Sequence, residues 1–275
     1  MTVEDENVDP SDPYASPLAH FGSEVKLERE RLDLKRPEFA KKVSCSPSLV
    51  AKIETGNRVP GLEFAEACDQ IFPHANGRFV RLWPLALRYA FPPWFRRYAE
   101  LEWVASAVRM FNPQLVPGLV QTEEYARAVL RTARPTNLDD LVTARIERQR
   151  ILTRDTPTKV WIILDVGVLT RTVGNKEVMR GQLTRLRDLA ETPPHRVQII
   201  PDKGRHHGWA SPFGMLSFPE GKDVVHVDGF PKGYLLAEAD DVQSGNDAYD
   251  LLNALALSPD ESAPVIDSII KDHYS

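Results

Sequence analysis

The amino-terminal third of the chain carries apolar side chains at the three- and four-residue spacing of amphipathic helices. Ser46 is a good N-cap for a helix that starts at Pro47, and Gly56 suits the left-handed position just after it. Pro84 is expected to kink or split the last helix of the series. The pattern predicts an all-α region with helices over about 18–31, 37–43, 47–55, 62–72 and 77–90.

Beyond Phe91-Pro92-Pro93 the pattern first continues as helices and then changes. The run Val160-Trp161-Ile162-Ile163-Leu164 is continuously apolar and short, which is typical of a strand buried on both faces. A strand–helix–strand passage favours a parallel pair, whereas the short later links favour antiparallel neighbours. We expect helices over about 94–108, 123–132, 138–153, 177–190, 240–257 and 262–273, and further strands over about 196–200, 213–218 and 224–227.

The distribution of charge is more informative than the net charge of −5. Residues 35–58 contain six basic and two acidic side chains, and residues 76–98 contain five arginines and no acid. A local basic field of this kind attracts phosphate. Two short helices joined by a tight turn, with polar and basic groups on the second, can place side chains in the major groove of DNA. Nucleic-acid binding is therefore the first hypothesis.

The predicted fold class is α+β overall. It consists of an all-α helix-turn-helix N-terminal domain followed by an α+β domain with a small mixed sheet flanked by helices. The first fifteen residues hold five acidic side chains, no basic one and little to bury, so they are expected to be disordered. The expected divisions are an acidic tail over 1–15, a helix-turn-helix domain over 16–75, a connecting helix and linker over 76–93, and an α+β domain over 94–275.

Composition excludes several other classes of protein. No apolar run approaches the ~20 residues of a membrane-spanning helix, and the start lacks the order of a signal peptide. Cys45 and Cys68 occupy apolar-periodic helical positions, so free thiols are expected rather than a disulfide or a zinc site. We expect a cytoplasmic protein without a metal, a cofactor or a membrane partner.

A specific set of spaced residues runs through the first domain: Leu27 with Arg31, Leu34, Phe39-Ala40, Cys45-Ser46, Ile53-Glu54, Gly56 and Pro60. With this set, residues 21–71 resemble the helix-turn-helix of the lambda-repressor-like, xenobiotic-response-element family. Glu54 is then expected to pair within the domain. Three positions depart from that family's pattern. Lys35-Arg36 stand where Ser-Gln is usual, and Pro47 stands where Gln or Arg is frequent. Ser44 stands at the usual turn glycine and must either tolerate a left-handed conformation or reshape the turn.

The resemblance implies binding to a double-stranded DNA operator. Base reading is expected from Ser48 and Lys52, with Ser46 and Arg58 at the flanking phosphates. Relatives bind as dimers on two half-sites, which makes a homodimer the expected state. The apolar surplus of the helix at 77–90 can pack against a symmetric partner or be covered entirely by the second domain. The DNA-binding candidates are Lys35, Arg36, Ser46, Pro47, Ser48, Lys52, Asn57 and Arg58.

Motifs of the second domain include Val116-Pro117-Gly118-Leu119-Val120-Gln121-Thr122, Arg145-x-x-Arg148-Gln149 and Leu255-Ala256-Leu257-Ser258. With them, residues 93–270 resemble the C-terminal domain of the actinobacterial WhiJ-like regulators. This resemblance implies a transcriptional regulator, of development or specialised metabolism, that is often encoded beside a small partner protein. It supplies no known chemistry for the domain.

The second domain offers a few candidates for binding a ligand or partner. Arg145 and Arg148 share a helix face with apolar groups, which suits either an internal salt bridge, to Glu102 or Glu124, or recognition of an acidic partner. Asp165 ends a buried strand. His206 and His207 lie side by side in a Gly-rich loop but lack further metal ligands at a suitable spacing. The full set is Arg145, Arg148, Gln149, Asp165, His206 and His207.

No catalytic signature occurs in the sequence, so an enzyme is not expected. The leading interpretation is a sequence-specific DNA-binding transcriptional regulator, a repressor, whose second domain binds a ligand or a small partner protein. The alternative is a protein-interaction scaffold or antitoxin-like component without specific DNA readout. DNA affinity that falls steeply with salt and depends on Lys52 distinguishes the two.

Overall fold

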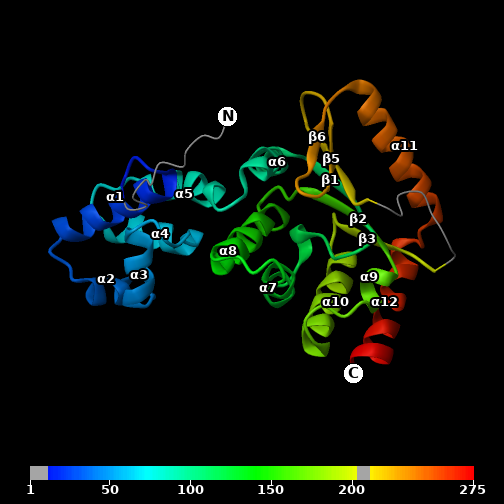
Figure 1. Cartoon of the computed structure of the whole chain (residues 1–275), viewed down its shortest axis with the longest axis horizontal. Coiled ribbons are helices and arrows are strands. Elements are labelled where there is room, and N and C mark those ends of the chain that lie inside the picture. Colours follow the sequence, from blue (N-terminus) through cyan, green and yellow to red (C-terminus); the bar gives the residue numbers. More distant parts are fainter. Residues whose placement is uncertain (1–11, 203–210) are drawn as a thin grey trace. The chain divides into compact units, whose positions relative to one another are not determined.

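The computed structural model describes residues 12–202 and 211–275 (Figure 1). Most of the expected acidic tail, and both His206 and His207, lie outside these residues. The described chain forms two compact units. The first contains the residues up to Arg96 together with Asp139–Glu147, and the second contains Arg97–Leu138 together with Arg148–Ser275. The helix expected to connect the domains therefore lies within the first unit.

The first unit is entirely helical, as its periodicity predicts. Five aromatic rings from four helices meet in its core, and Phe39 stacks on Phe72 with ring centroids 5.1 Å apart. Trp83 is also buried, and its indole Nε1 donates to the carbonyl of Pro60 over 2.9 Å. The helices are α1 (Pro17–Arg31), α2 (Arg36–Lys42), α3 (Pro47–Glu54), α4 (Leu62–Ile71), α5 (Arg78–Tyr89) and most of α8 (Leu138–Arg148).

Each of the first five helices matches its expected segment to within a residue or so at either end. Pro84 lies inside α5 without splitting it. Two turns adopt the backbone conformations expected from sequence. Gly56, just after α3, has a φ of 68°, and Ser44, between α2 and α3, has a φ of 54°. Ser44 thus takes the left-handed conformation that its place in the turn requires.

The second unit is built on a six-stranded mixed sheet in the order β3-β2-β1-β4-β5-β6. β1, β2 and β3 run parallel to one another, while β4, β5 and β6 add antiparallel neighbours on the other side of β1. The parallel pair expected from the strand–helix–strand passage, β2 with β3, and the antiparallel pair β4 with β5 are therefore confirmed, whereas β4 pairs with β1 rather than with the preceding strand β3. The strands are β1 (Ala107–Asn112), β2 (Lys159–Asp165), β3 (Arg196–Ile200), β4 (Phe213–Ser217), β5 (Val224–Val227) and β6 (Tyr234–Leu236).

Helices flank this sheet (Figure 1). α11 packs its Tyr249 and Leu252 over Phe111, Ile163 and neighbouring apolar side chains on one face. α10 and α12 lie side by side and both pack against β3. The helical segments are α6 (Pro93–Val104), η1 (Gly118–Val120), α7 (Glu123–Arg131), η2 (Gln149–Leu152), α9 (Gly167–Thr170), α10 (Lys176–Ala190), α11 (Ala239–Leu255) and α12 (Pro259–Tyr274). The α+β class expected from sequence is confirmed.

Two strands differ from the sequence-based expectation. The helix expected over 94–108 ends at Val104, and the chain enters the central strand β1 at Ala107. No glycine or proline separates the two elements, and Arg109 and Met110 are good helix formers, so local preference hides the strand. The short edge strand β6 was also not predicted, because three residues are too few to show a period.

Candidate DNA-binding surface

The helix at the centre of the candidate surface is α3, and its ends are fixed by local hydrogen bonds. The Ser46 hydroxyl accepts from the backbone N–H of Leu49 over 3.1 Å, which caps the first turn. Val50 and Ile53 are buried against the core of the unit. On the opposite side Ser48 and Lys52 are exposed, together with Pro47. The side chains expected to read bases thus lie on the solvent side of a well-anchored helix.

A buried carboxylate attaches α3 to the rest of the unit. Glu54, the last residue of α3, has a fully buried side chain that lies 2.5 Å from the Nε of Arg29 and 2.7 Å from the Nε of Arg36. The hydrogen bond that Arg29 donates to Glu54 raises the pKa of the Arg29 guanidinium above its usual value. Because Arg29 comes from α1 and Arg36 from α2, the carboxylate joins three helices. The internal pairing expected for Glu54 is confirmed.

A close backbone approach fixes α3 against α1. An added Cβ on Gly22, in the middle of α1, would clash with the carbonyl oxygen of Ile53 in α3. Only a residue without a Cβ lets the two helices come this near. Gly22 was not among the residues predicted from the sequence, although a glycine inside a helical pattern is a signal of such packing.

Four lysines of the helix-turn-helix segment are exposed: Lys35, Lys41, Lys42 and Lys52. Arg36 has a half-exposed side chain, so its contact with Glu54 leaves part of the guanidinium at the surface. Asn57 is exposed and donates to the Thr55 hydroxyl over 3.0 Å. These groups together give a basic surface around α3, which suits the approach of phosphates.

Arg58 is placed differently from the expectation of a free phosphate contact. Its Nη1 lies 2.9 Å from Oδ1 of Asp140, and its Nη2 lies 3.1 Å from the Thr143 hydroxyl. Only 22% of the side chain is exposed. In this structure, Arg58 is therefore held by an internal partner from α8, a contact that no local pattern in the sequence indicates.

In the second unit, Arg148 is ion-paired in the interior. Its Nε lies 2.6 Å from Oε2 of Glu102, one of the two partners suggested by the sequence, and the Glu102 side chain is fully buried. Burial raises the pKa of Glu102, although Arg148 acts in the opposite direction. The rings of Tyr98 and His226 pack against each other beside this pair, tilted by 38° with their centroids 4.2 Å apart. Burial lowers the pKa of His226.

The other partner candidates have varied surroundings. Gln149 is buried, and its amide donates to the backbone carbonyls of Gly118 and Gln121. In this structure, its side chain therefore makes hydrogen bonds within the second unit. Asp165 accepts from the N–H of Gly167 over 2.7 Å at the start of α9. Arg145 is half-buried in the first unit.

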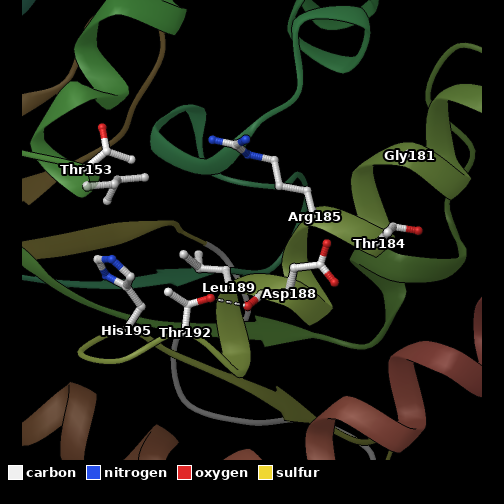
Figure 2. Close-up of a pocket in the computed structure, with 9 residues that line it drawn as sticks. Thr153, Gly181, Thr184, Arg185, Asp188, Leu189, Thr192 and His195 are labelled. Atoms are coloured by element: carbon white, nitrogen blue, oxygen red, sulfur yellow. Dashed lines mark hydrogen bonds between the residues drawn. The ribbon is translucent and has the colours of Figure 1, made fainter.

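A depression of about 380 Å³ lies beside α10 in the second unit (Figure 2). Arg185, Asp188 and His195 supply its polar groups, with threonines around them. Arg185 donates to the Val120 carbonyl and to Oε1 of Gln149, and burial lowers its pKa. The pKa of His195 is also lowered by burial. None of these residues could be predicted as a site from the sequence, because no motif joins them.

Neither a metal centre nor a membrane-spanning helix is found in the part of the chain that the structure describes. Across residues 12–202 and 211–275, no group of histidine, cysteine and acidic side chains is arranged to hold a metal ion. No helix in this part of the chain is both long and apolar enough to cross a bilayer. Cys45 and Cys68 are free thiols, as expected.

Comparison with protein families matches both units. A model described as "Helix-turn-helix domain" matches residues 20–72, which include α2, the turn at Ser44 and α3. A model described as "Domain of unknown function (DUF5753)" matches residues 95–268. No curated protein and no solved structure is significantly similar to the chain. Since the second model covers more than half of its residues, the chain belongs to the DUF5753 family and carries a helix-turn-helix domain before that region.

Proposed function

We propose that this protein is a sequence-specific DNA-binding transcriptional regulator, a repressor of the WhiJ-like type. The observation that carries the proposal is the geometry of α3. It is capped by Ser46, held by the buried carboxylate of Glu54, and exposes Ser48 and Lys52 inside a basic surface. A rigid helix with a polar, basic outer side is what major-groove readout requires.

The test starts from selection of bound duplexes out of a random-sequence library. Anisotropy titrations with a selected duplex should then give an affinity that falls steeply as salt rises. Lys52→Ala should weaken binding about tenfold or more, since a good base contact contributes about 1–3 kcal/mol. Its melting temperature should stay near that of the wild type, because Lys52 is exposed.

Lys271→Ala is the matched control. It removes the same charge from an exposed position on α12, in the second unit, and should leave DNA affinity unchanged. Failure of the wild type to select any duplex would contradict the proposal and favour the protein-interaction scaffold instead. Equal affinities of wild type and Lys52→Ala would remove Lys52 from the interface.

The same proposal includes a homodimer and a second unit that binds a ligand or a small partner protein. One helix-turn-helix contacts too little DNA for tight specific binding, and two copies on half-sites supply the remainder. Val80, Leu85 and Tyr89 of α5 remain partly exposed and are available for such an interface. Light scattering at micromolar concentration should give a dimer mass. A monomer mass that persists with a palindromic duplex would contradict this part of the proposal.

A further inference from the structure

Part of the DUF5753 region is built into the DNA-binding unit. Residues 139–147, the greater part of α8, belong to the same compact unit as α1 to α5. Ala144 is fully buried and belongs to the same hydrophobic core as Val59, just beyond α3. This segment therefore stands where a change in the second unit can reach the loop that follows the recognition helix.

The contacts of this segment converge on Arg58 and its neighbour. Oδ1 of Asp140 accepts from Nη1 of Arg58 over 2.9 Å and from the backbone N–H of Val59 over 3.0 Å. The hydroxyl of Thr143 accepts from Nη2 of Arg58 over 3.1 Å. Asp140 is itself largely covered, with 15% of its side chain exposed. The Asp140 carboxylate thus receives from Arg58 the same kind of charge-assisted hydrogen bond that arginine gives to a phosphate.

The location of Arg58 makes this arrangement relevant to DNA. Arg58 lies four residues after the end of α3, in a segment whose basic groups would meet the DNA backbone beside the groove. While Asp140 holds the guanidinium of Arg58, the positive charge of Arg58 is neutralised and its hydrogen-bond donors are occupied. The carboxylate also places a negative charge near the approaching phosphates, which lowers affinity.

We propose that residues 139–147 form an inhibitory latch, in which the Asp140 carboxylate stands in for a DNA phosphate on Arg58. DNA binding at full strength requires the latch to release, so that a phosphate replaces Asp140. This inference rests on the proposed DNA-binding function. It adds a regulatory role for a segment of the DUF5753 region.

The end of α8 provides a way to control the latch. The helix continues from Glu147 to Arg148, whose guanidinium is ion-paired with the buried Glu102 inside the second unit. The latch segment and Arg148 therefore belong to one continuous helix.

Asp140→Asn tests the latch while keeping the shape of the side chain. With a short mixed-sequence duplex as probe, this variant should bind about three- to tenfold more tightly than wild type at low salt. The slope of log affinity against log salt should steepen by about 0.9, as expected for one added phosphate contact. Asp139→Asn is the matched control: it removes the same charge from the neighbouring residue, which is exposed, and should give a smaller change.

A double variant identifies the cation involved. Adding Arg58→Ala to Asp140→Asn should abolish the gain in affinity and restore the wild-type salt slope. Thr143→Val, which removes one hydrogen bond but no charge, should give a smaller gain in the same direction. Amide exchange gives a readout that does not depend on affinity. The backbone N–H of Val59 donates to Asp140. Its hydrogen exchange should become faster when duplex is added, because release of the latch breaks this bond.

Different outcomes would contradict either the latch or the proposed DNA-binding function. If Asp140→Asn binds duplex no better than wild type, or more weakly and with a lower melting temperature, Asp140 only positions the loop and the latch is refuted. Thr143→Val changes no charge. If this variant binds duplex more weakly than wild type, the latch is likewise refuted. If wild type and all variants fail to bind duplex in a salt-dependent way, the proposed function itself is refuted.

Discussion

The Nε atom of Arg29 lies 2.5 Å from Oε1 of Glu54, and the two residues join the first helix of the DNA-binding unit to the end of its recognition helix. A second nitrogen of the same guanidinium lies 3.2 Å from the other carboxylate oxygen. Such two-point geometry fixes orientation as well as distance. The position of α3 therefore depends on one buried carboxylate.

Removing that carboxylate should strongly destabilise the first unit. Glu54→Ala leaves the buried guanidinium of Arg29 without its main partner, which typically costs about 3–5 kcal/mol. Urea denaturation should show this loss in the free energy of unfolding. Glu30→Ala is the control, since Glu30 also contacts Arg29 but is half-exposed. A loss below 1 kcal/mol for Glu54→Ala would contradict the central role given to this pair.

The left-handed conformation of Ser44 offers a stabilising substitution. At a φ of 54°, a residue with a side chain is strained by about 1–2 kcal/mol relative to glycine. Glycine also makes the unfolded chain more flexible, which offsets part of the stability gained by removing that strain. Ser44→Gly should raise the free energy of unfolding by about 0.5–1 kcal/mol. Ser48→Gly, the same replacement inside α3, should lower it instead. A lower melting temperature for Ser44→Gly would show that the Ser44 side chain contributes to the fold.

Acid should weaken the first unit through Glu28. Hydrogen bonds and charge from Arg78 and Arg31 hold the pKa of Glu28 below its ordinary value of 4.5. A depressed folded-state pKa stabilises the protein above the unfolded value, and this contribution is lost as the pH falls through the folded one. The melting temperature should therefore drop below about pH 4.5.

Glu28→Gln should show a smaller drop over the same acid range, because it has no proton to gain at this position. Glu66→Gln, at an exposed position on α4, should follow the wild-type profile. Identical acid profiles for wild type and Glu28→Gln would mean that another group controls acid stability. Thermal melts at a series of pH values give all three profiles.

Arg148→Ala should destabilise the second unit by about 3–5 kcal/mol, because it leaves the fully buried Glu102 without its cationic partner. Adding Glu102→Gln should recover part of the loss, since the unpaired charge is then gone. Chemical denaturation of the single and double variants measures both effects. If Arg148→Ala were as stable as wild type, Arg148 would be available to bind an acidic partner instead.

The sequence predicts much of the fold because local patterns determine most of its elements. Val160–Leu164 is apolar throughout and forms the buried strand β2, and Ser46 and Gly56 bound α3 as their chemistry requires. β1 was missed because its pairing with β2 and β4 is long-range and overrides the helical preference of its residues. Local preference carries no information about such partners.

The same limit applies to the candidate site. Ser48 and Lys52 could be identified, because helical period alone places them opposite the buried side of α3. The partner of Arg58 could not, since Asp140 lies 82 positions away in the sequence. Gly22 and Arg185 were missed for a related reason: their roles depend on which backbone or hollow they face after folding.

The membership of residues 139–147 in the helical unit has a consequence for how this protein is made and recombined. A ribosome must release the chain through Glu147 before the unit can complete its core, so we expect the DNA-binding part to mature only after the first part of the next domain has been synthesised. For the same reason, the helix-turn-helix is not an exchangeable module. A chimaera joined after Arg96 would lose Ala144 from the core and Asp140 from the Val59 loop.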